Sequence, residues 1–282
     1  MKLGVSIYSY YNLWKNGQID IPTFIRTVHE IGADGVELLE PLWRDKAAEL
    51  AAVDEALAAT GVEVGVYSVS NDFVTTSADD RKAAVDKIRV GVDSALHFGA
   101  KIVRVFAGNT KEGISFEQAF DWIVEGLSES SRYAEAKGVR LALENHGKLA
   151  GKSDQVKRIL KAVGSPALGA NPDTGNFLLV HQSPHEAIHS LATQAFMVHF
   201  KDFREVPESF DGFAYTSLDG LKYAGTAIGE GDVALESCIN ELKAASFSGW
   251  LNIEYEGAED PRTALPRSVK YTRSLIDGKP SK

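Results

Sequence analysis

Three carboxylates and one imidazole recur at the ends of short apolar segments of this chain. Glu144 ends the run LALE, Asp173 follows LGANP, His199 lies in MVHF, and Glu254 follows WLNI. Short apolar runs of this kind predict buried strands of a parallel sheet, and a charged residue at such an end has left the core. Three carboxylates that meet at one place repel one another unless a cation lies between them. The pattern therefore indicates a divalent metal site.

The donor set also indicates which metal to expect. Oxygen ligands with one imidazole and no thiolate favour one Mn²⁺ ion, and Mg²⁺, Co²⁺ or Zn²⁺ are alternatives. Each residue has a simpler explanation as well: Glu144 can pair with Arg104, Asp173 can cap the short loop of NPDTGN, Glu254 can pair with Lys201, and His199 can be a core histidine. The joint metal site is nevertheless favoured, because the three carboxylates and the imidazole end consecutive predicted strands.

The elements that position these residues alternate along the chain. Eight strand-like runs are separated by segments with helical spacing of apolar residues, and this alternation predicts one closed (β/α)₈ barrel over residues 1–282. An open doubly wound sheet is the alternative, but no G-x-G-x-x-G follows the first strand. The predicted strands are 3–9, 35–40, 62–70, 101–108, 140–146, 167–173, 196–203 and 250–257, and the clearest helices are 21–33, 45–61, 81–100 and 116–138.

The barrel prediction brings the four residues together. Active sites of such barrels lie at the C-terminal ends of the strands, and strands five to eight are contiguous there, about 4.8 Å from one to the next. After the seventh strand, residues 204–232 form a segment too long for an ordinary loop. It carries Phe210, Phe213 and Tyr215. We expect this long loop to be a lid or a binding wall, or else a contact between subunits.

Composition narrows the class of function. The net charge of -9 argues against a nucleic-acid partner. The single cysteine, Cys238, lies on a predicted helix and is expected to be a buried thiol. No apolar run approaches the roughly 20 residues of a membrane span, and the first residues lack a signal-like segment. We therefore expect a soluble, cytoplasmic protein without a membrane partner.

Four motifs carry a family resemblance: ALENHG (142–147), NPDTGN (171–176), VHFKD (198–202) and GEGDV (229–233). Through them the chain resembles the xylose isomerase-like TIM barrel superfamily, the sugar phosphate isomerase/epimerase family, over nearly its whole length. The resemblance implies that Glu144, Asp173, His199 and Glu254 hold one divalent metal, commonly Mn²⁺. It implies a small sugar or keto-sugar substrate and a homodimer or homotetramer. Members include ketose 3-epimerases, hydroxypyruvate isomerase, inosose dehydratase and lyases that act on 3-keto-glycosides.

The chemistry expected of such a site is the removal of a proton from a carbon next to a carbonyl. A metal ion stabilises the negative oxygen of the resulting enediolate. Return of the proton gives an epimer or an isomer, and loss of a β-substituent gives elimination. We expect a sugar isomerase/epimerase, with a lyase or dehydratase as the alternative and a non-catalytic sugar-binding barrel as a further one. Phosphodiester hydrolysis, as in endonuclease IV, needs more histidines at strand ends than this chain offers.

The candidate acids and bases are Glu144, Glu254 and His146. His146 is two residues beyond Glu144, so strand alternation predicts that both side chains share one face; orientation of a metal ligand is its alternative role. In ketose 3-epimerases, the glutamates that match Glu144 and Glu254 exchange protons across the substrate. Those enzymes carry a glutamate and a histidine where this chain has Ala150 and Asn176, which weakens the two-base prediction and leaves His146 as the more distinctive residue.

The candidate substrate-binding residues are Lys201, Arg204, Asn176, Tyr8 and Trp14. Lys201 shares the face of the imidazole two positions before it, and it can bind a substrate oxygen or neutralise a carboxylate. Arg204 opens the long loop. The aromatic rings of Tyr8 and Trp14 follow the first strand and can stack on a sugar, or they can pack within the loop.

Overall fold

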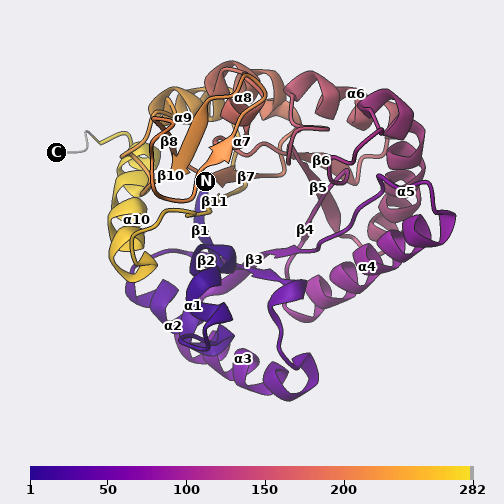
Figure 1. The fold of residues 1–282 in the computed structure, drawn as a ribbon. Helices are drawn as coiled ribbons and strands as arrows, with labels where there is room; N and C mark the ends of the chain where they lie inside the picture. Colours follow the sequence, from indigo (N-terminus) through magenta and orange to yellow (C-terminus); the bar gives the residue numbers. More distant parts are fainter. Residues whose placement is uncertain (280–282) are drawn as a thin grey trace.

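The computed structural model describes residues 1–279, and it confirms the predicted barrel. Eight parallel strands form a ring with the helices outside it (Figure 1). The ring runs in the order β6-β5-β4-β3-β2-β1-β11-β7. Its strands are β1 (Lys2–Ser6), β2 (Gly35–Leu39), β3 (Glu63–Ser68), β4 (Ile102–Val105), β5 (Arg140–Glu144), β6 (Leu168–Asn171), β7 (Met197–Phe200) and β11 (Trp250–Ile253).

Helices follow the strands and cover the outside of the ring. The longer ones are α2 (Ile21–Glu30), α3 (Lys46–Thr60), α4 (Ala78–His97), α5 (Phe116–Ala136), α6 (Ser153–Val163), α8 (Pro184–Leu191), α9 (Leu235–Ala244) and α10 (Pro261–Asp277). Short turns of helix lie at the mouth or between elements: η1 (Ile7–Tyr10), α1 (Tyr11–Lys15), η2 (Glu40–Leu42), α7 (Asn176–Leu179) and η3 (Ala192–Gln194). Polar side chains fix where helices begin; Ser115 and Gln118, for example, form a reciprocal capping box at the start of α5.

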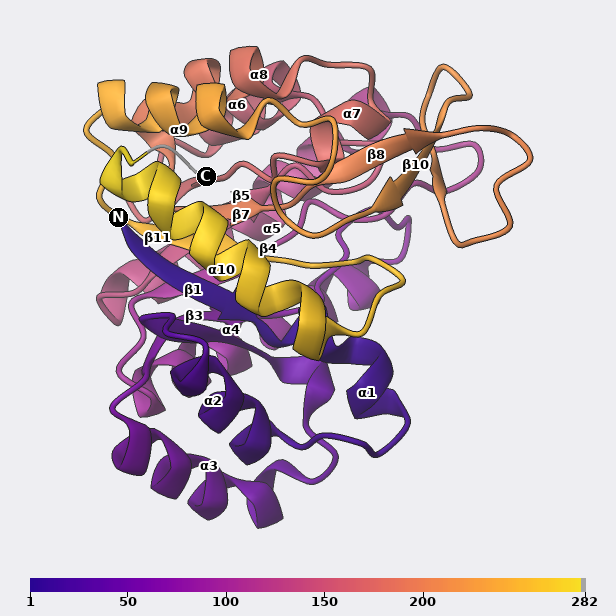
Figure 2. The same cartoon turned by 90° about the vertical axis from the view of Figure 1, so that its left-hand side faces the viewer.

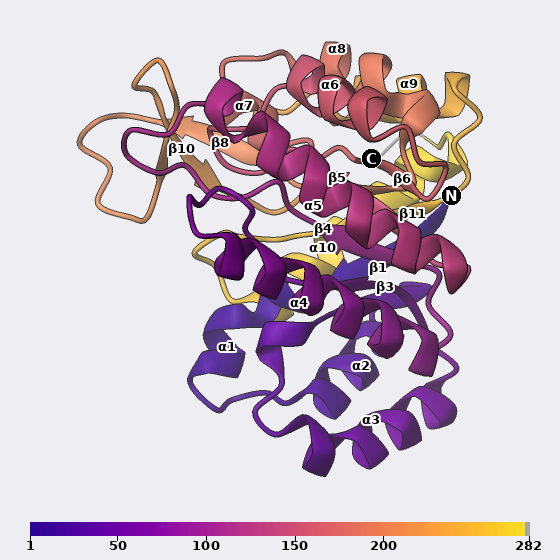
Figure 3. The same cartoon turned by 90° about the vertical axis from the view of Figure 1, so that its right-hand side faces the viewer.

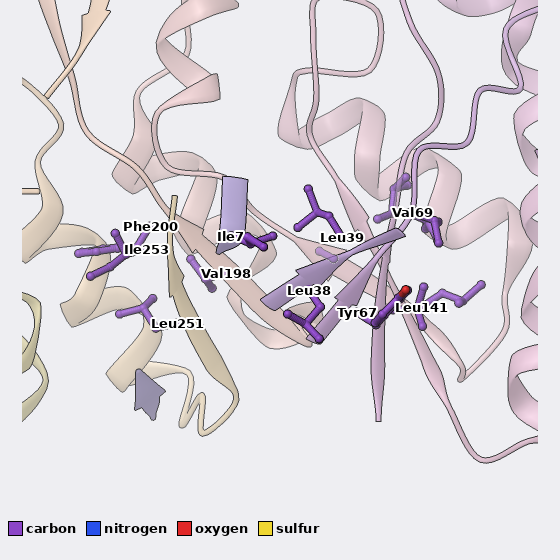
Figure 4. Packing of buried hydrophobic residues seen from close by; sticks show 14 of the residues in the cluster. Ile7, Leu38, Leu39, Tyr67, Val69, Leu141, Val198, Phe200, Leu251 and Ile253 are labelled. Atoms are coloured by element: carbon purple, nitrogen blue, oxygen red, sulfur yellow. The ribbon is translucent and has the colours of Figure 1, made fainter. Parts of the chain in front are cut away.

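The two faces of the strands differ in what they bury. Outward-facing residues such as Leu38, Val198 and Leu251 belong to the large core cluster between the ring and the helices (Figure 4). Inside the ring, Met197 belongs to a small apolar cluster that also holds Val66, Ile102 and Ala142 and packs against Trp250. Alternation then places polar side chains above this apolar layer.

Glycines make room for the Trp250 indole at the bottom of the ring. A Cβ on Gly65 of β3 would lie 2.3 Å from the indole, and a Cβ on Gly35 of β2 would lie 2.5 Å from it. Only glycine allows the tryptophan to occupy this position, because a methyl group on either strand would overlap the ring. Trp250 therefore closes the barrel at the end opposite to the predicted site.

The ring closes between β6 and β7 through isolated pairings in place of a continuous ladder. These pairings join Ala170 to Ala195 and Asp173 to His199. The backbone N–H of Thr174 donates to the carbonyl of His199 at 3.0 Å, and that of Phe196 donates to the carbonyl of Ala170 at 2.9 Å. Two predicted metal ligands are thus fixed next to each other by the closure of the barrel.

The segment predicted as a long loop over 204–232 is partly a small sheet. Strands β8 (Phe203–Val206), β9 (Tyr215–Thr216) and β10 (Lys222–Gly225) pair antiparallel in the order β8-β10-β9. Figures 2 and 3 show this insert projecting beyond one end of the barrel. The loop prediction is wrong for these strands, because strands of two to four residues leave no periodic signal in the sequence.

The remaining structural expectations concern Cys238 and membrane helices. Cys238 is fully buried in α9, as expected. Within residues 1–279, no helix has both the length and the apolar character that crossing a membrane requires. The single-domain organisation, the cytoplasmic location and the homodimer or homotetramer stay predictions.

Candidate metal centre

The four predicted ligands converge at the C-terminal mouth of the barrel. One donor atom from each of Glu144, Asp173, His199 and Glu254 lies within 4.8 Å of every other, and all four residues are buried. Glu144 is the last residue of β5 and His199 lies within β7, whereas the other two follow the ends of β6 and β11. The ends of four strands therefore bring together a donor set of three carboxylates and one imidazole.

The imidazole of His199 is held in one orientation by Glu37 on β2. Its Nε2 lies 2.9 Å from Oε2 of Glu37, so it is this nitrogen that donates a proton to the carboxylate. Glu37 also accepts from Nδ2 of Asn252 at 3.1 Å and from the hydroxyl of Ser68. Nδ1 of His199 is thereby turned toward the other ligands, 3.2 Å from Oε2 of Glu144. A carboxylate behind a ligating histidine is the usual arrangement around protein-bound metals.

Nδ1 of His199 and Oδ2 of Asp173 are buried and make no contact of hydrogen-bond geometry with any described residue, although Nδ1 lies 3.2 Å from Oε2 of Glu144 and Oδ2 lies 3.0 Å from the ammonium of Lys201. They lie 3.9 Å apart, and both residues are 0% exposed. Buried polar atoms are nearly always satisfied, so each exception calls for an explanation. A cation bound between these atoms satisfies both, and we conclude that the residues fit a divalent metal ion.

The remaining atoms of the ligands are held by neighbouring groups. Oδ1 of Asp173 accepts from the backbone N–H groups of Gly175 at 2.9 Å and Asn176 at 3.0 Å, so Oδ2 is the oxygen that lies near the ammonium of Lys201 and the imidazole of His199. The side-chain amide of Asn176 donates to Oε1 of Glu144 at 3.3 Å, and that of Asn171 donates to Oε2 at 3.2 Å. Asn176, predicted to bind substrate, therefore positions a metal ligand in this structure.

Electrostatics differ from one carboxylate to the next. Burial alone raises the pKa of Glu144, but the charge of His199 and that of Arg104, whose Nε is 3.3 Å away, bring the pKa well below its ordinary value. Burial raises the pKa of Asp173 to about 7, and neighbouring carboxylates add to the rise while Lys201 opposes it. In the metal-free protein, burial disfavours a charged His199, yet the carboxylate of Glu37 and its neighbours raise the pKa of the imidazole well above its usual range.

Lys201 lies among three carboxylates. Its ammonium group is 3.0 Å from Oδ2 of Asp173, 2.7 Å from Oε2 of Glu254 and 2.5 Å from Oε1 of Glu256. Burial opposes the charge, but these carboxylates raise the pKa of Lys201 well above its ordinary value. Of its two predicted roles, neutralising carboxylates is therefore the one seen here.

Five buried or nearly buried carboxylates surround this mouth, against two residues that always carry positive charge. The carboxylates are Glu37, Glu144, Asp173, Glu254 and Glu256, and the cations are Arg104 and Lys201. Buried charges of one sign are costly unless they are compensated. The excess of negative charge is what a divalent cation would neutralise.

His146 lies just beyond the end of β5. The strand ends at Glu144, and the backbone N–H of His146 turns back to donate to the carbonyl of Glu144 at 3.0 Å. The predicted strand over 140–146 is thus two residues too long, because the chain turns after Glu144. The imidazole packs on Phe106 at 4.2 Å between ring centres, and its buried Nδ1 has no hydrogen-bond partner. Burial lowers the pKa of His146 against the opposing charge of Glu144.

Three other predicted substrate residues lie at different distances from the cluster. The ring of Tyr8 stacks on Tyr11 at 5.4 Å, and burial raises the pKa of Tyr8 to about 12, helped by the charges of Glu256 and Glu254. Trp14 stacks on the other side of Tyr11 and carries the guanidinium of an arginine over its ring. Arg204 is exposed and donates to the carbonyl of Glu230 at 2.8 Å. Tyr8 therefore borders the cluster, and the structure shows no contact of Arg204 with the four ligands within residues 1–279.

Glu256 is the main residue that the sequence reasoning missed. It lies two positions beyond Glu254, so alternation along the eighth strand was a signal that both face the mouth. Glu37 and Arg104 lie inside the barrel and pair with His199 and Glu144. The carboxylate of Asp202 accepts from the backbone N–H groups of Gly229 and Gly231, both at 2.9 Å.

Comparison with known proteins agrees with this fold. Inosose dehydratase of Clostridium beijerinckii is 25% identical over 153 residues, which is 53% of this chain and 51% of that protein. The chain thus matches about half of the length of this curated relative. Two solved structures show the same fold: the IOLI protein with a binding zinc atom (TM-score 0.79, 18% identity, all of both chains) and a xylose isomerase-like TIM barrel protein of Mycobacterium smegmatis in complex with magnesium (TM-score 0.76, 17% identity, 98% of this chain and 97% of that one).

The sequence profile described as xylose isomerase-like TIM barrel matches residues 25–275, which is most of the chain. The matched range contains β2 to β11 and all four residues of the metal cluster. The chain therefore belongs to the xylose isomerase-like TIM barrel family.

Proposed function

We propose that this protein is a divalent-metal-dependent enzyme of the sugar isomerase/epimerase class that removes a proton from a sugar or keto-sugar carbon next to a carbonyl. The observation that carries the proposal is the convergence of Glu144, Asp173, His199 and Glu254, all buried, with one donor atom of each within 4.8 Å of every other. The ion, for which Mn²⁺ is the first candidate, supplies a Lewis acid that stabilises negative charge on the carbonyl oxygen of the substrate. A relative of the same fold is described with zinc and another with magnesium, which supports a divalent ion.

Residues of this chain have the other roles in the proposed reaction. Glu144 and Glu254 are carboxylates of the cluster that would hold the ion, and they are the candidates for moving the proton. Glu144 is fixed by Asn171 and Asn176, whereas Glu254 shares the ammonium of Lys201. Lys201 limits the repulsion between the carboxylates when they are ionised. The apolar layer around Trp250 closes the barrel below the site, and the four predicted ligands are buried.

His146 favours a second candidate reaction, elimination. Its Nδ1 is buried beside the cluster without a hydrogen-bond partner, so it is available to give a proton to a leaving group or to take one. Asn176 replaces the histidine of two-base epimerases and is occupied with Glu144. The similarity to inosose dehydratase, which its name describes as a dehydratase, also favours this reaction. A lyase or dehydratase acting on a keto-sugar, a 3-keto-glycoside or an inosose is therefore the alternative.

The experiment is incubation of the metal-loaded protein with a panel of ketoses, an inosose and 3-keto-glycosides in D₂O, followed by NMR. Solvent deuterium at the carbon next to the carbonyl of a recovered isomer or epimer supports the leading proposal. A released leaving group or an unsaturated product supports elimination. The Asp173→Asn variant and chelator treatment should abolish either reaction, and full activity in chelator would refute the metal-dependent mechanism.

A matched pair of histidine variants tests the assignment of His146. His146→Gln should slow elimination strongly, whereas His185→Gln on the outer helix α8 should leave it unchanged. Equal rates for both variants would remove His146 from the reaction. If no compound of the panel exchanges deuterium or yields a product, the remaining alternative of a non-catalytic sugar-binding barrel becomes the better account.

A further inference from the structure

A second cavity lies beside the metal centre, on the side of the mouth where the insert projects. Its volume is about 790 Å³. Three segments form its wall: residues 8–13 after β1, the insert between β7 and α9, and residues 255–261 after β11. The volume lies in the range of roughly 300–1,000 Å³ that is typical of small-molecule sites.

The cavity and the metal centre share part of one wall. Glu256 lines the cavity, and its Oε1 is 2.5 Å from the ammonium of Lys201, which in turn is 2.7 Å from Oε2 of the predicted metal ligand Glu254. The hydroxyl of Tyr215, another lining residue, donates to Glu256. A group in the cavity is therefore separated from a metal ligand by the side chains of Glu256 and Lys201 only.

The lining is aromatic and acidic. Tyr8 and Tyr11 stack at 5.4 Å on one side, and Phe213 meets the ring of Tyr215 edge-on at 4.8 Å on the other. No lysine or arginine is among the described residues that line the cavity. The lining aromatic residues are Tyr8, Tyr11, Phe210, Phe213, Tyr215 and Tyr255, and the lining acids are Glu256, Glu259 and Asp260.

The aromatic and acidic lining favours some substituents of a sugar substrate over others. Lysine and arginine are common partners of a bound phosphate or carboxylate, and acids repel such groups. Aromatic faces instead pack against the flat apolar faces of rings. Phe213 is 72% exposed and Phe210 is 38% exposed. Large apolar side chains at such exposure, gathered at one cavity, are typical of a binding site.

We propose that this cavity receives a neutral ring joined to the sugar that reacts at the metal centre, so that the substrate is an unphosphorylated glycoside of at least two rings. This inference rests on the proposed function, because it assumes that the reacting sugar binds at the metal centre. The second ring is an aromatic aglycone or another sugar, since both present the same apolar faces. Phe210 and Phe213 are its specificity-determining contacts, contributed by the insert.

The test measures binding to the metal-loaded protein by isothermal titration calorimetry. The probes are p-nitrophenyl β-D-glucopyranoside, cellobiose, D-glucose and D-glucose 6-phosphate. We expect at least one two-ring probe to bind about tenfold more tightly than glucose, which is the order of gain from one or two aromatic contacts. The first two probes distinguish an aromatic from a sugar second ring. We expect glucose 6-phosphate to bind no more tightly than glucose.

Variants localise the effect to the cavity. Phe210→Ala combined with Phe213→Ala should remove the tenfold gain of the two-ring probe and change glucose binding less than about twofold. Leu218→Ala is the matched control, because Leu218 lies on the same insert, is 55% exposed and does not line the cavity. It should bind every probe as the wild-type protein does. Since all three side chains are exposed, these variants are expected to fold.

Several results would overturn the inference. In the first, neither two-ring probe binds more tightly than glucose. In the second, glucose 6-phosphate binds more tightly than glucose. In the third, the double variant and Leu218→Ala lose the same amount of affinity for the two-ring probe. The deuterium-exchange experiment separates this failure from that of the proposed function. Exchange in a single-ring ketose without any gain from a second ring refutes the cavity assignment alone. A cavity-dependent gain without exchange or elimination in any compound refutes the proposed reaction and leaves the ring site in place.

Discussion

Replacement of Glu37 tests the metal centre without removing a ligand. Three donors reach the carboxylate of Glu37: Nε2 of His199 at 2.9 Å, Nδ2 of Asn252 at 3.1 Å and the hydroxyl of Ser68. In Glu37→Gln, the shape is kept but one acceptor oxygen becomes an NH₂ group. The hydroxyl of Ser68 can rotate to accept from that group, so the glutamine carbonyl remains available to His199. The variant therefore removes the negative charge behind the imidazole and keeps its orientation.

The expected loss of metal affinity follows from the removal of this negative charge. A hydrogen bond to a charged acceptor is roughly twice as strong as one to a neutral acceptor, and partners behind metal ligands are typically worth about 10–100-fold in metal affinity. We expect Glu37→Gln to weaken metal binding about tenfold, which is about 1.4 kcal/mol. In Glu37→Ala, the Nε2–H of the buried His199 loses its acceptor and the ring loses its orientation. We expect a loss near the upper limit there, about 100-fold.

The assay is competition for Zn²⁺ and Mn²⁺ against a fluorescent chelator, with the thermal midpoint of the metal-free protein measured in parallel. Glu40→Gln is the control, because Glu40 lies three residues further along the chain and binds the ammonium of Lys46 at 2.6 Å outside the cluster. It should leave the metal affinity within about twofold of the wild-type value. If Glu37→Gln and Glu37→Ala both bind the metal as tightly as the wild-type protein, Glu37 does not orient the imidazole and the reasoning is refuted.

Three further predictions concern other parts of the fold. Asp202→Ala removes the acceptor for three backbone N–H groups within 229–233, so it should lower the free energy of unfolding in urea by about 3 kcal/mol; a change below about 1 kcal/mol would contradict this role. Burial raises the pKa of the fully buried Cys238 to about 12, so a disulfide reagent should modify the thiol only after denaturant is added, and fast reaction in the native protein would show that α9 opens. Gly65→Ala should destabilise the barrel by about 1–3 kcal/mol, because the new Cβ meets the Trp250 indole at 2.3 Å. Adding Trp250→Phe should recover part of that loss, and no recovery would place the strain elsewhere.

The ring of strands was predictable because each strand is a compact apolar run. The predicted ends were too long, as in 250–257 for β11 (Trp250–Ile253). Buried residues continue past the last paired position there, since Glu254 and Tyr255 are still covered by neighbouring loops. An apolar run in the sequence indicates which residues are buried, whereas the end of a strand is set by its hydrogen bonds to the neighbouring strands. The same difference explains the insert, where β9 has only two residues and depends on pairing with β10.

The cluster of predicted metal ligands could be foreseen for a different reason. Glu144, Asp173, His199 and Glu254 come from neighbouring strands, so knowledge of the barrel order was sufficient to place them together. The direction of Glu256 was within reach as well, because alternation along the predicted strand 250–257 puts it on the face of Glu254, although β11 itself ends at Ile253. The ion pair that Glu256 forms was not predictable, because it depends on how far the ammonium of Lys201, the residue after β7, extends toward the carboxylate.

Glu37 marks the limit of what the sequence specifies. It lies 162 residues before His199, and their strands, β2 and β7, are not hydrogen-bonded neighbours in the ring. A contact across the interior depends on the tilt and stagger of all eight strands, since these set the height at which inward side chains meet. The sequence gives the inward direction of the Glu37 carboxylate but not that height. A one-residue change of register would turn the carboxylate to the outer face and leave the imidazole without an acceptor. The orientation of the one nitrogen ligand, and with it the affinity of the metal centre, is therefore a property of the closed barrel and of no local motif.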